Sequence, residues 1–244
     1  MTTERTFLRH EIEWTRERAS RIWDYIGSNK AYEDLYFSRR HGESLIRYLR
    51  RRRLPFSGRM LDFGCGPGFF LEMLLRRGIG CEGIDFSEAS VRLARERLES
   101  YPSAGPVILA PGFPLPIESD AFDVVFFIET IEHLLPDDLD ATVAELRRVT
   151  RQAKLLVVTT PNDENLEGEK VLCPECGCVF HRIQHVRAWT AASLSNYMSG
   201  HGFARVTCEA VTLTERSLRS RVVTAWNAVS GSKKPHLVYI GRKI

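Results

Sequence analysis

The residues ETIEH, Glu129 to His133, combine two carboxylates and an imidazole at spacings that place them on one face of a helical turn. An imidazole of near-neutral pKa can take the proton from an attacking hydroxyl group, and the three side chains together can also hold a divalent ion. Three interpretations follow. In the first, the three residues belong to a turn and make only local hydrogen bonds. In the second, His133 is a general base that Glu129 or Glu132 orients. In the third, Glu129, Glu132 and His133 bind a metal together with a later histidine.

A second stretch, CPECGCVFHRIQH, contains three cysteines and two histidines. Cys173 and Cys176 have C-x-x-C spacing, and His181 and His185 are four residues apart. Two thiolates with two imidazoles form a favoured tetrahedral Zn²⁺ shell, so the pattern predicts structural zinc at these four residues, with Cys178 able to replace one histidine. A metal-free lid and a thiol function are the alternatives. His185 cannot easily serve both this zinc and a catalytic ion.

The chain must position these side chains, and the stretch LDFGCGPG, residues 61–68, indicates how. A short apolar strand runs into Gly64, Gly66 and Gly68, and a helix follows. Glycines allow a sharp turn close to a ligand, and a helix N-terminus offers free N–H groups. Asp85 ends the next strand, where a carboxylate can accept hydrogen bonds from both hydroxyls of a ribose. The alternative is that Asp85 only caps the helix that begins near Ser87.

Strands and helices alternate beyond residue 58, which predicts an α/β domain with a parallel sheet and helices on both faces. We expect an N-terminal helical cap over residues 1–57 and the α/β domain over 58–244. Residues 162–188, which contain the cysteines, are expected to form an irregular insertion after the fifth strand. Such an insertion lies over the carboxyl edge of the sheet, where it would cover the site at which a substrate binds. The predicted strands are 59–63, 80–86, 106–110, 121–129 and 153–161, and the predicted helices between and after them are 68–78, 87–100, 137–150 and 190–203.

Composition and charge indicate which partners and which cellular location to expect. The 244 residues include 34 basic and 31 acidic side chains, a net charge of +3, which argues against nucleic-acid binding through bulk charge. The charged N-terminus lacks the apolar core of a signal peptide, and no apolar run approaches the ~18 residues of a membrane span. Six cysteines without a secretory signal favour a reducing, cytoplasmic location.

Four ordered motifs, LDFGCGPG, GIDFSEASV, LPIESDAFDVVFFIETIEHL and TPN, resemble those of class I S-adenosylmethionine-dependent methyltransferases over roughly residues 58–205. The resemblance implies a Rossmann-like, mostly parallel sheet of seven strands with an antiparallel last strand. It implies S-adenosylmethionine as the cofactor, with Asp85 on its ribose and Phe86 beside its adenine. Many members of the family have an acidic residue after the third strand, near the amino group of the adenine. The corresponding segment here, LAPGFPLP, has no acidic residue, so main-chain contacts to the adenine around residues 110–113 are expected instead. The implied cofactor site comprises Asp62, Gly64, Cys65, Gly66, Gly68, Asp85, Phe86, Ala110 and Glu129.

The E-x-x-E-H sequence, followed by TPN and a histidine before Trp-Thr, is also similar to small-RNA 3′-end 2′-O-methyltransferases. That resemblance implies Mg²⁺ held by Glu129, Glu132, His133 and His185, or His181 in place of His185. The segment HVRAWT is equally similar to bacterial methyltransferases that act on sugars, lipids and small metabolites. We therefore expect O-methylation of a small metabolite, sugar or lipid precursor with His133 as base. A metal-dependent RNA 2′-O-methyltransferase and a non-catalytic binding partner of the same fold are the alternatives, and the oligomeric state is not predicted.

Overall fold

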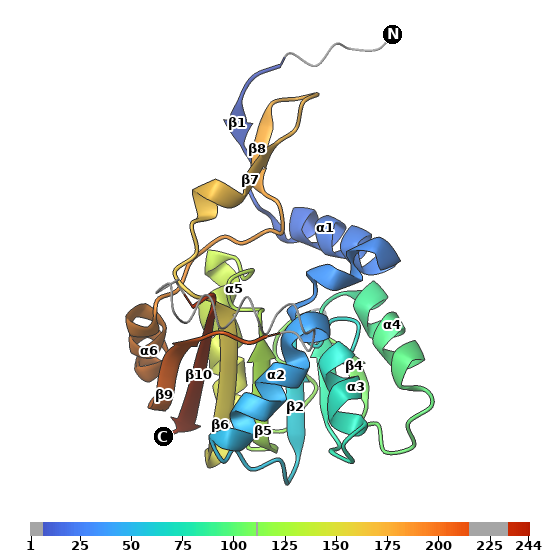
Figure 1. Ribbon diagram of the computed structural model, residues 1–244, viewed down its shortest axis with the longest axis vertical. Helices are drawn as coiled ribbons and strands as arrows, with labels where there is room; N and C mark the ends of the chain where they lie inside the picture. The colour runs from blue at the N-terminus through green and yellow to red at the C-terminus, as the bar shows by residue number, and fades with distance from the viewer. Residues whose placement is uncertain (1–6, 111, 215–233) are drawn as a thin grey trace.

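The computed structural model describes residues 7–110, 112–214 and 234–244, and its centre is a twisted sheet flanked by helices (Figure 1). In the described residues this sheet has seven strands in the order β4-β3-β2-β5-β6-β10-β9. All neighbours from β4 to β6 pair in parallel, whereas β10 is antiparallel to both β6 and β9. The predicted mostly parallel sheet with an antiparallel last strand is confirmed. The strands are β2 (Met60–Phe63), β3 (Glu82–Asp85), β4 (Val107–Leu109), β5 (Phe122–Ile128), β6 (Thr150–Pro161), β9 (Phe203–Val211) and β10 (His236–Lys243).

The central strand β5 shows why the helices cover both faces of the sheet. Its sequence FDVVFFI is almost continuously apolar, as expected for a strand that is buried on both sides. Val124, Phe126 and Ile128 join one apolar cluster with residues of α2, α3 and α4. Val125 and Phe127 join the opposite cluster with residues of α5 and α6. These helices are α2 (Phe37–Arg51), α3 (Phe69–Leu75), α4 (Glu88–Leu98), α5 (Pro136–Val149) and α6 (Ala191–Gly200).

The N-terminal helices lie where the sequence predicted a cap. Thr15 caps the N-terminus of helix α1 (Arg16–Ser28), and its side chain accepts from the N–H of Arg18. The 3₁₀ helix η1 (Lys30–Leu35) follows and leads into α2. Figure 1 shows α1 beyond the carboxyl ends of the parallel strands, the end at which α/β sheets bind ligands. The boundary between residues 57 and 58 stays a prediction, since α2 also packs into the core.

The insertion over residues 162–188 is more ordered than predicted. It contains the short helix η2 (Leu166–Glu169) and a hairpin of β7 (Lys170–Leu172) and β8 (Cys178–His181). Strand β1 (His10–Glu11) pairs in parallel with β8, which completes a small sheet (Figure 1). The expectation of an irregular segment was wrong here because strands of two to four residues carry too little periodicity to be recognised. Strand β1 and the insertion therefore form one unit beyond the carboxyl edge of the main sheet (Figure 1).

In the portion of the chain that the structure describes, no helix has the length and apolar character needed to cross a membrane.

Candidate active site

The glycine loop and Asp85 meet at the carboxyl edge of the sheet. Gly64, Gly66 and Gly68 all have left-handed φ angles, of 77°, 52° and 79°. The main-chain N–H of Gly66 donates to Oδ2 of Asp85 at 2.8 Å. The other carboxylate oxygen, Oδ1, accepts from the N–H of Ser87 at 2.9 Å. Asp85 therefore joins the loop to the start of α4, so the two features that the sequence singled out adjoin each other.

The loop is also tightly enclosed. A Cβ atom at Gly64 would lie 2.6 Å from Oγ1 of Thr130, which leaves no room for a side chain. A Cβ atom at Gly66 would lie 3.3 Å from Cε1 of Tyr36, so this tyrosine of the cap closes over the loop. A backbone cradle that only glycine fits, with a carboxylate beside it, suits a nucleoside-containing cofactor such as S-adenosylmethionine.

The remaining predicted cofactor residues differ in exposure. Phe86 is 39% exposed and its ring meets Phe113 edge-on, with centroids 5.9 Å apart. Ala110 is buried and its N–H donates to the main-chain oxygen of Asp85 at 2.9 Å. Asp62 in β2 and Cys65 in the loop itself are both buried; burial and then the charge of Asp85 raise their pKa values, that of Asp62 to about 8. Pro111, part of the predicted main-chain contact to adenine, lies outside the described residues.

Glu129, Glu132 and His133 lie on a turn directly after β5. Glu129 has a left-handed φ of 47°, and its N–H donates to the main-chain oxygen of Thr159 at 3.0 Å. Such backbone strain is concentrated at functional sites. Nε2 of His133 lies 3.9 Å from Oε1 of Glu132. The structure therefore brings together the three residues that the sequence predicted as catalytic.

Burial governs the charge state of these groups. It raises the pKa of Glu129 to about 8 and that of Glu132 well above its usual range, and it lowers the pKa of His133 well below its usual range. Among the described residues, neither carboxylate oxygen of Glu132 has a hydrogen-bond partner. A buried carboxylate without a partner is costly.

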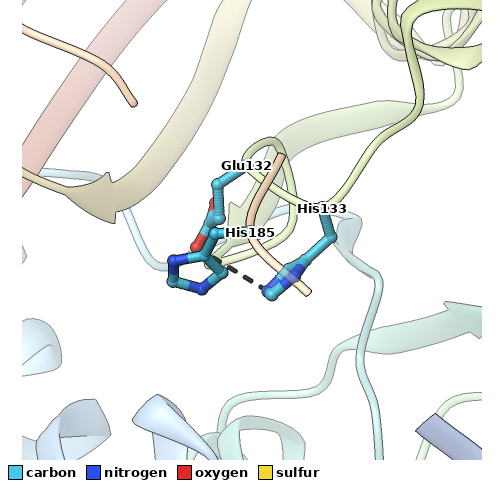
Figure 2. A group of neighbouring side chains, drawn as sticks. All are labelled: Glu132, His133 and His185. Carbon is cyan, nitrogen blue, oxygen red and sulfur yellow. Dashed lines mark ion pairs between the residues drawn. The ribbon is translucent and has the colours of Figure 1, made fainter. Parts of the chain in front are cut away.

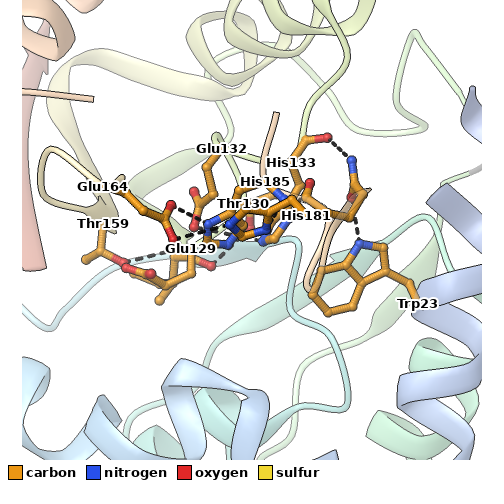
Figure 3. A network of polar contacts seen from close by, with 11 residues as sticks. Trp23, Glu129, Thr130, Glu132, His133, Thr159, Glu164, His181 and His185 are labelled. Atoms are coloured by element: carbon orange, nitrogen blue, oxygen red, sulfur yellow. Dashed lines mark hydrogen bonds and ion pairs between the residues drawn. The ribbon is translucent and has the colours of Figure 1, made fainter. Parts of the chain in front are cut away.

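The insertion adds three more titratable groups to this turn (Figures 2 and 3). Nδ1 of His185 lies 2.5 Å from Oε2 of Glu164, and Nε2 of His181 lies 3.6 Å from Oε1 of the same carboxylate. The His185 ring meets the His133 ring edge-on, with centroids 4.7 Å apart (Figure 2), and stacks on the His181 ring, with centroids 4.6 Å apart. Although burial opposes it, the two neighbouring histidines, His185 within hydrogen-bond distance, lower the pKa of Glu164 to about 2. We call Glu129, Glu132, His133, Glu164, His181 and His185 the acid–histidine cluster.

The cap closes over this cluster through a short polar chain. Nε1 of Trp23 in α1 donates to Oε1 of Gln184 at 2.9 Å, and Nε2 of Gln184 donates to the main-chain oxygen of His133 at 2.8 Å (Figure 3). The Trp23 and His133 rings also meet edge-on, with centroids 4.8 Å apart. Gln184 is buried and has a left-handed φ of 61°. The first helix, the insertion and the turn after β5 therefore contact one another at one point.

Comparison with known proteins identifies the family of the central part of the chain. Residues 61–158, which run from β2 to β6, match a family model described as a methyltransferase domain. The chain contains a class I S-adenosylmethionine-dependent methyltransferase domain. It is 32% identical over 148 residues to ajmaline N-methyltransferase of Rauvolfia serpentina, covering 57% of this chain and 49% of that protein. It is also 32% identical over 150 residues to a ubiquinone biosynthesis O-methyltransferase of Alkalilimnicola ehrlichii, covering 61% of this chain and 58% of that one. The chain thus spans about half the length of these curated relatives.

Solved structures share the fold of this methyltransferase domain at low sequence identity. A putative methyltransferase of Haloferax volcanii, solved in complex with the methyltransferase activator Trm112, has a TM-score of 0.68 and 16% identity, covering 91% of this chain and 97% of that one. The 1,6-didemethyltoxoflavin-N1-methyltransferase of Burkholderia thailandensis, solved with its substrate and S-adenosylhomocysteine, has a TM-score of 0.66 and 16% identity, covering 97% of this chain and 93% of that one. These likenesses support the fold of the domain.

The methyltransferase domain does not bring the predicted zinc ligands together. In the described residues, the candidate metal-ligand groups are Glu132 with His133 and His185, and Glu164 with His181 and His185; neither contains a cysteine. Cys173 and Cys176 lie in the turn of the β7–β8 hairpin, whereas His181 ends β8. A strand rises by about 3.3 Å per residue, so an extended β8 carries His181 away from the turn. The predicted Cys₂His₂ set is therefore split between two places.

Glu164, Gln184 and Trp23 belong to this site and were missed as site residues in the sequence. Glu164 closely follows the last residue of β6, at the carboxyl edge where ligands bind, and that position was the available signal. Gln184 and Trp23 carry no such signal, because their contact joins segments 161 residues apart.

Proposed function

We propose that the protein is an S-adenosylmethionine-dependent methyltransferase that methylates an oxygen of a small metabolite, sugar or lipid precursor. One observation carries the proposal. The glycine loop with Asp85 and the buried turn of Glu129, Glu132 and His133 lie at the same edge of the sheet, and Thr130 of that turn contacts Gly64. A cofactor on the loop would therefore present its methyl group beside the acid–histidine cluster.

The cofactor proposal follows from the loop. Asp85 would accept the ribose hydroxyls, and the N–H groups at the start of α3 would face the rest of the nucleoside. Phe86 offers an exposed ring for the adenine, with Ala110 beside it as a main-chain contact. When bound, S-adenosylmethionine supplies the activated methyl group, and the protein contributes mainly by aligning the acceptor with it.

The acceptor would lie against the acid–histidine cluster under the cap. An oxygen nucleophile must lose a proton as it attacks, and we assign that removal to this cluster, in which the sequence predicted His133 as the base. The names of the relatives support small-molecule acceptors, with oxygen in the ubiquinone biosynthesis enzymes and nitrogen in the ajmaline enzyme. The nearly balanced charge of the chain supports a small acceptor over RNA.

The experiment combines cofactor binding with turnover. Calorimetry should show one S-adenosylmethionine bound per chain, and S-adenosylhomocysteine should accumulate with members of a panel of phenols, hydroxy acids and sugars. Turnover confined to RNA 3′ ends, with binding that weakens steeply as salt increases, would establish the RNA alternative instead. Failure to bind S-adenosylmethionine would leave only the non-catalytic alternative.

A further inference from the structure

We propose that one Zn²⁺ ion binds at the tip of the small sheet and fastens strand β1 to the β7–β8 hairpin. Its ligands are Cys173, Cys176, Cys178 and His10. This set keeps the C-x-x-C cysteines of the zinc site that the sequence predicted. It replaces the two histidines of that site, which belong to the acid–histidine cluster, by a third cysteine and by a histidine from the N-terminal strand.

The pairing of the strands places three of these residues in one row. Cys173 and Cys178 lie opposite each other across the hairpin, where the N–H of Cys173 donates to the main-chain oxygen of Cys178 at 2.8 Å. His10 is the partner of Cys178 in the parallel pairing of β1 with β8. Residues opposite each other in a sheet point to the same face, with Cβ atoms about 4.5–5.5 Å apart. The two thiols and the imidazole therefore share one face of the small sheet.

His181 points to the other face of the same sheet. It comes three residues after Cys178 in β8, and successive side chains of a strand alternate between the two faces. Nε2 of His181 lies 3.6 Å from Oε1 of Glu164, and the His181 side chain is buried. The cysteines of the hairpin are partly exposed. The hairpin thus presents His181 to the acid–histidine cluster and its cysteines away from it.

The turn between β7 and β8 favours thiolates, the form of cysteine that binds metals. The main-chain N–H groups of Cys176 and Glu175 lower the pKa of Cys173, and the Cys176 thiol lowers it further. Burial raises the pKa of Cys178, and the charges of Cys176 and Cys173 add to that rise. The sulfurs are therefore near enough to repel one another as thiolates, and a cation among them would remove that repulsion.

His10 has the free nitrogen that a ligand needs. Its Nδ1 lies 2.7 Å from the main-chain oxygen of Leu8, which can only accept, so Nδ1 carries the proton and Nε2 keeps its lone pair. A carbonyl on the second nitrogen is a usual support of a ligating histidine. The backbone of His10 is fixed as well, because its N–H donates to the main-chain oxygen of Gly177 at 3.1 Å. A Cβ atom at Gly177 would lie 2.5 Å from the oxygen of Leu8, so strand and turn are in direct contact.

Three thiolates and one imidazole form a closed tetrahedral Zn²⁺ shell, which is typical of structural sites. Bonds of about 2.0–2.3 Å place the donor atoms roughly 3.3–3.8 Å apart. In the part of the chain that the structure describes, no three of these donors lie within 4.8 Å of one another. Rotation of the side chains about their χ1 bonds would bring the row and Cys176 together, since the backbone already holds the strands in register.

The ion would hold the cap over the acid–histidine cluster. Strand β1 leads into α1 with Trp23, the hairpin leads to Gln184, and these two side chains meet beside His133. This consequence rests on the proposed function, whereas binding of the ion does not. Removal of Zn²⁺ should raise KM for the acceptor at least about 5-fold and leave S-adenosylmethionine affinity within about twofold.

The test titrates reduced, metal-free protein with Co²⁺ as a coloured probe and then displaces it with Zn²⁺. We expect one ion per chain, with intense thiolate-to-cobalt charge transfer. His10→Ala and Cys178→Ser should each weaken binding at least about 100-fold, because loss of a supporting group alone costs about 10- to 100-fold. The matched controls are His201→Ala, whose imidazole pairs with Asp140, and Cys208→Ser in β9, and both should bind as wild type does.

Hydrogen exchange tests the fastening directly. The N–H groups of His10 and Ile12 donate to main-chain oxygens of Gly177 and Val179. With free Zn²⁺ at 100 times its dissociation constant, these two amides should exchange about 100-fold more slowly than in metal-free protein. Equal exchange with and without Zn²⁺ would show that no ion joins the two segments.

Other results would also overturn the inference. It fails if the reduced protein binds no Co²⁺, if the bound Co²⁺ shows no thiolate charge transfer, or if His10→Ala binds it as wild type does. Loss of binding in His181→Ala with full binding in His10→Ala would restore the predicted Cys₂His₂ set. If Cys178→Ser does not fold by circular dichroism, the exposed His10 decides. S-adenosylmethionine binding is measured on the same samples, and a protein that binds the ion but not the cofactor would contradict only the proposed function.

Discussion

At the scale of single residues, Asp85 has the clearest task, because one carboxylate oxygen holds the glycine loop and the other holds the start of α4. Asp85→Asn keeps the shape but loses the charge and one acceptor. A hydrogen bond to a charged group contributes about 1.5–3 kcal/mol, so we expect S-adenosylmethionine to bind about 10- to 100-fold more weakly by calorimetry. Asp120→Asn, at the exposed end of a pair with Lys243, is the control. Equal affinities in wild type and Asp85→Asn would contradict the ribose assignment.

Asp62, also at the scale of single residues, leads to a prediction about how the stability of the fold depends on pH. Burial raises its pKa from 3.8 to about 8, so the folded state keeps a proton that the unfolded chain releases. The contribution to stability is complete below about pH 4 and is lost as pH rises toward 8, with a limiting slope of about 1.4 kcal/mol per pH unit. Asp62→Asn removes this loss. Urea unfolding from pH 5 to 8 should therefore show the variant gaining on wild type as pH rises, and parallel curves would contradict the assignment.

At the scale of elements, the glycine loop is fixed by its contact with the turn after β5. An alanine in a left-handed conformation costs about 1 kcal/mol, and Gly64 and Gly78 share that conformation. A Cβ atom at Gly64 would also meet Thr130, whereas one at Gly78 would meet nothing within 4 Å. Overpacking costs about 1–3 kcal/mol, so Gly64→Ala should lose that much more stability in urea than Gly78→Ala. Equal losses would mean that the loop yields, and a Thr130→Ala background should relieve part of the difference.

The helices and strands also show how much of the fold could be predicted from the sequence. The strands from β2 to β6 and their helices were predictable, because long apolar runs and helical periods alternate and glycines mark the turns. The acid–histidine turn followed from the position of Glu129 directly after a strand. The hairpin of β7 and β8 was missed because its strands are too short for a pattern. The cysteines and histidines were grouped by closeness in sequence, but an extended strand separates Cys176 from His181. Glu164 was missed although it closely follows β6, because its partners His181 and His185 come together with it only in the folded insertion.

At the scale of the whole molecule, the cap reaches the site through Trp23. Trp23→Phe keeps the aromatic contact with His133 but removes the donor to Gln184, leaving Oε1 of a buried side chain without that bond. An unsatisfied buried acceptor costs about 1–3 kcal/mol. If the cap shapes the acceptor pocket, KM for the acceptor should rise about 5- to 100-fold while S-adenosylmethionine affinity stays within about twofold.

Tyr25→Phe on the same helix is the matched control for the cap. It removes an exposed hydroxyl contact with Tyr32 and should leave both constants unchanged. A Trp23→Phe variant that lost cofactor and acceptor binding equally would show that the cap supports the whole fold and not the pocket.

The pairing of helix α1 with the insertion has a consequence for biosynthesis. Gln184 is synthesised 161 residues after Trp23. At translation rates of about 5–20 residues per second, α1 waits roughly 8–32 s for the segment that it packs against. During that time Trp23 has no Gln184 to donate to, so this part of the nascent cap is exposed to a chaperone. The cluster of buried acids and histidines is closed only when nearly the whole domain has been made.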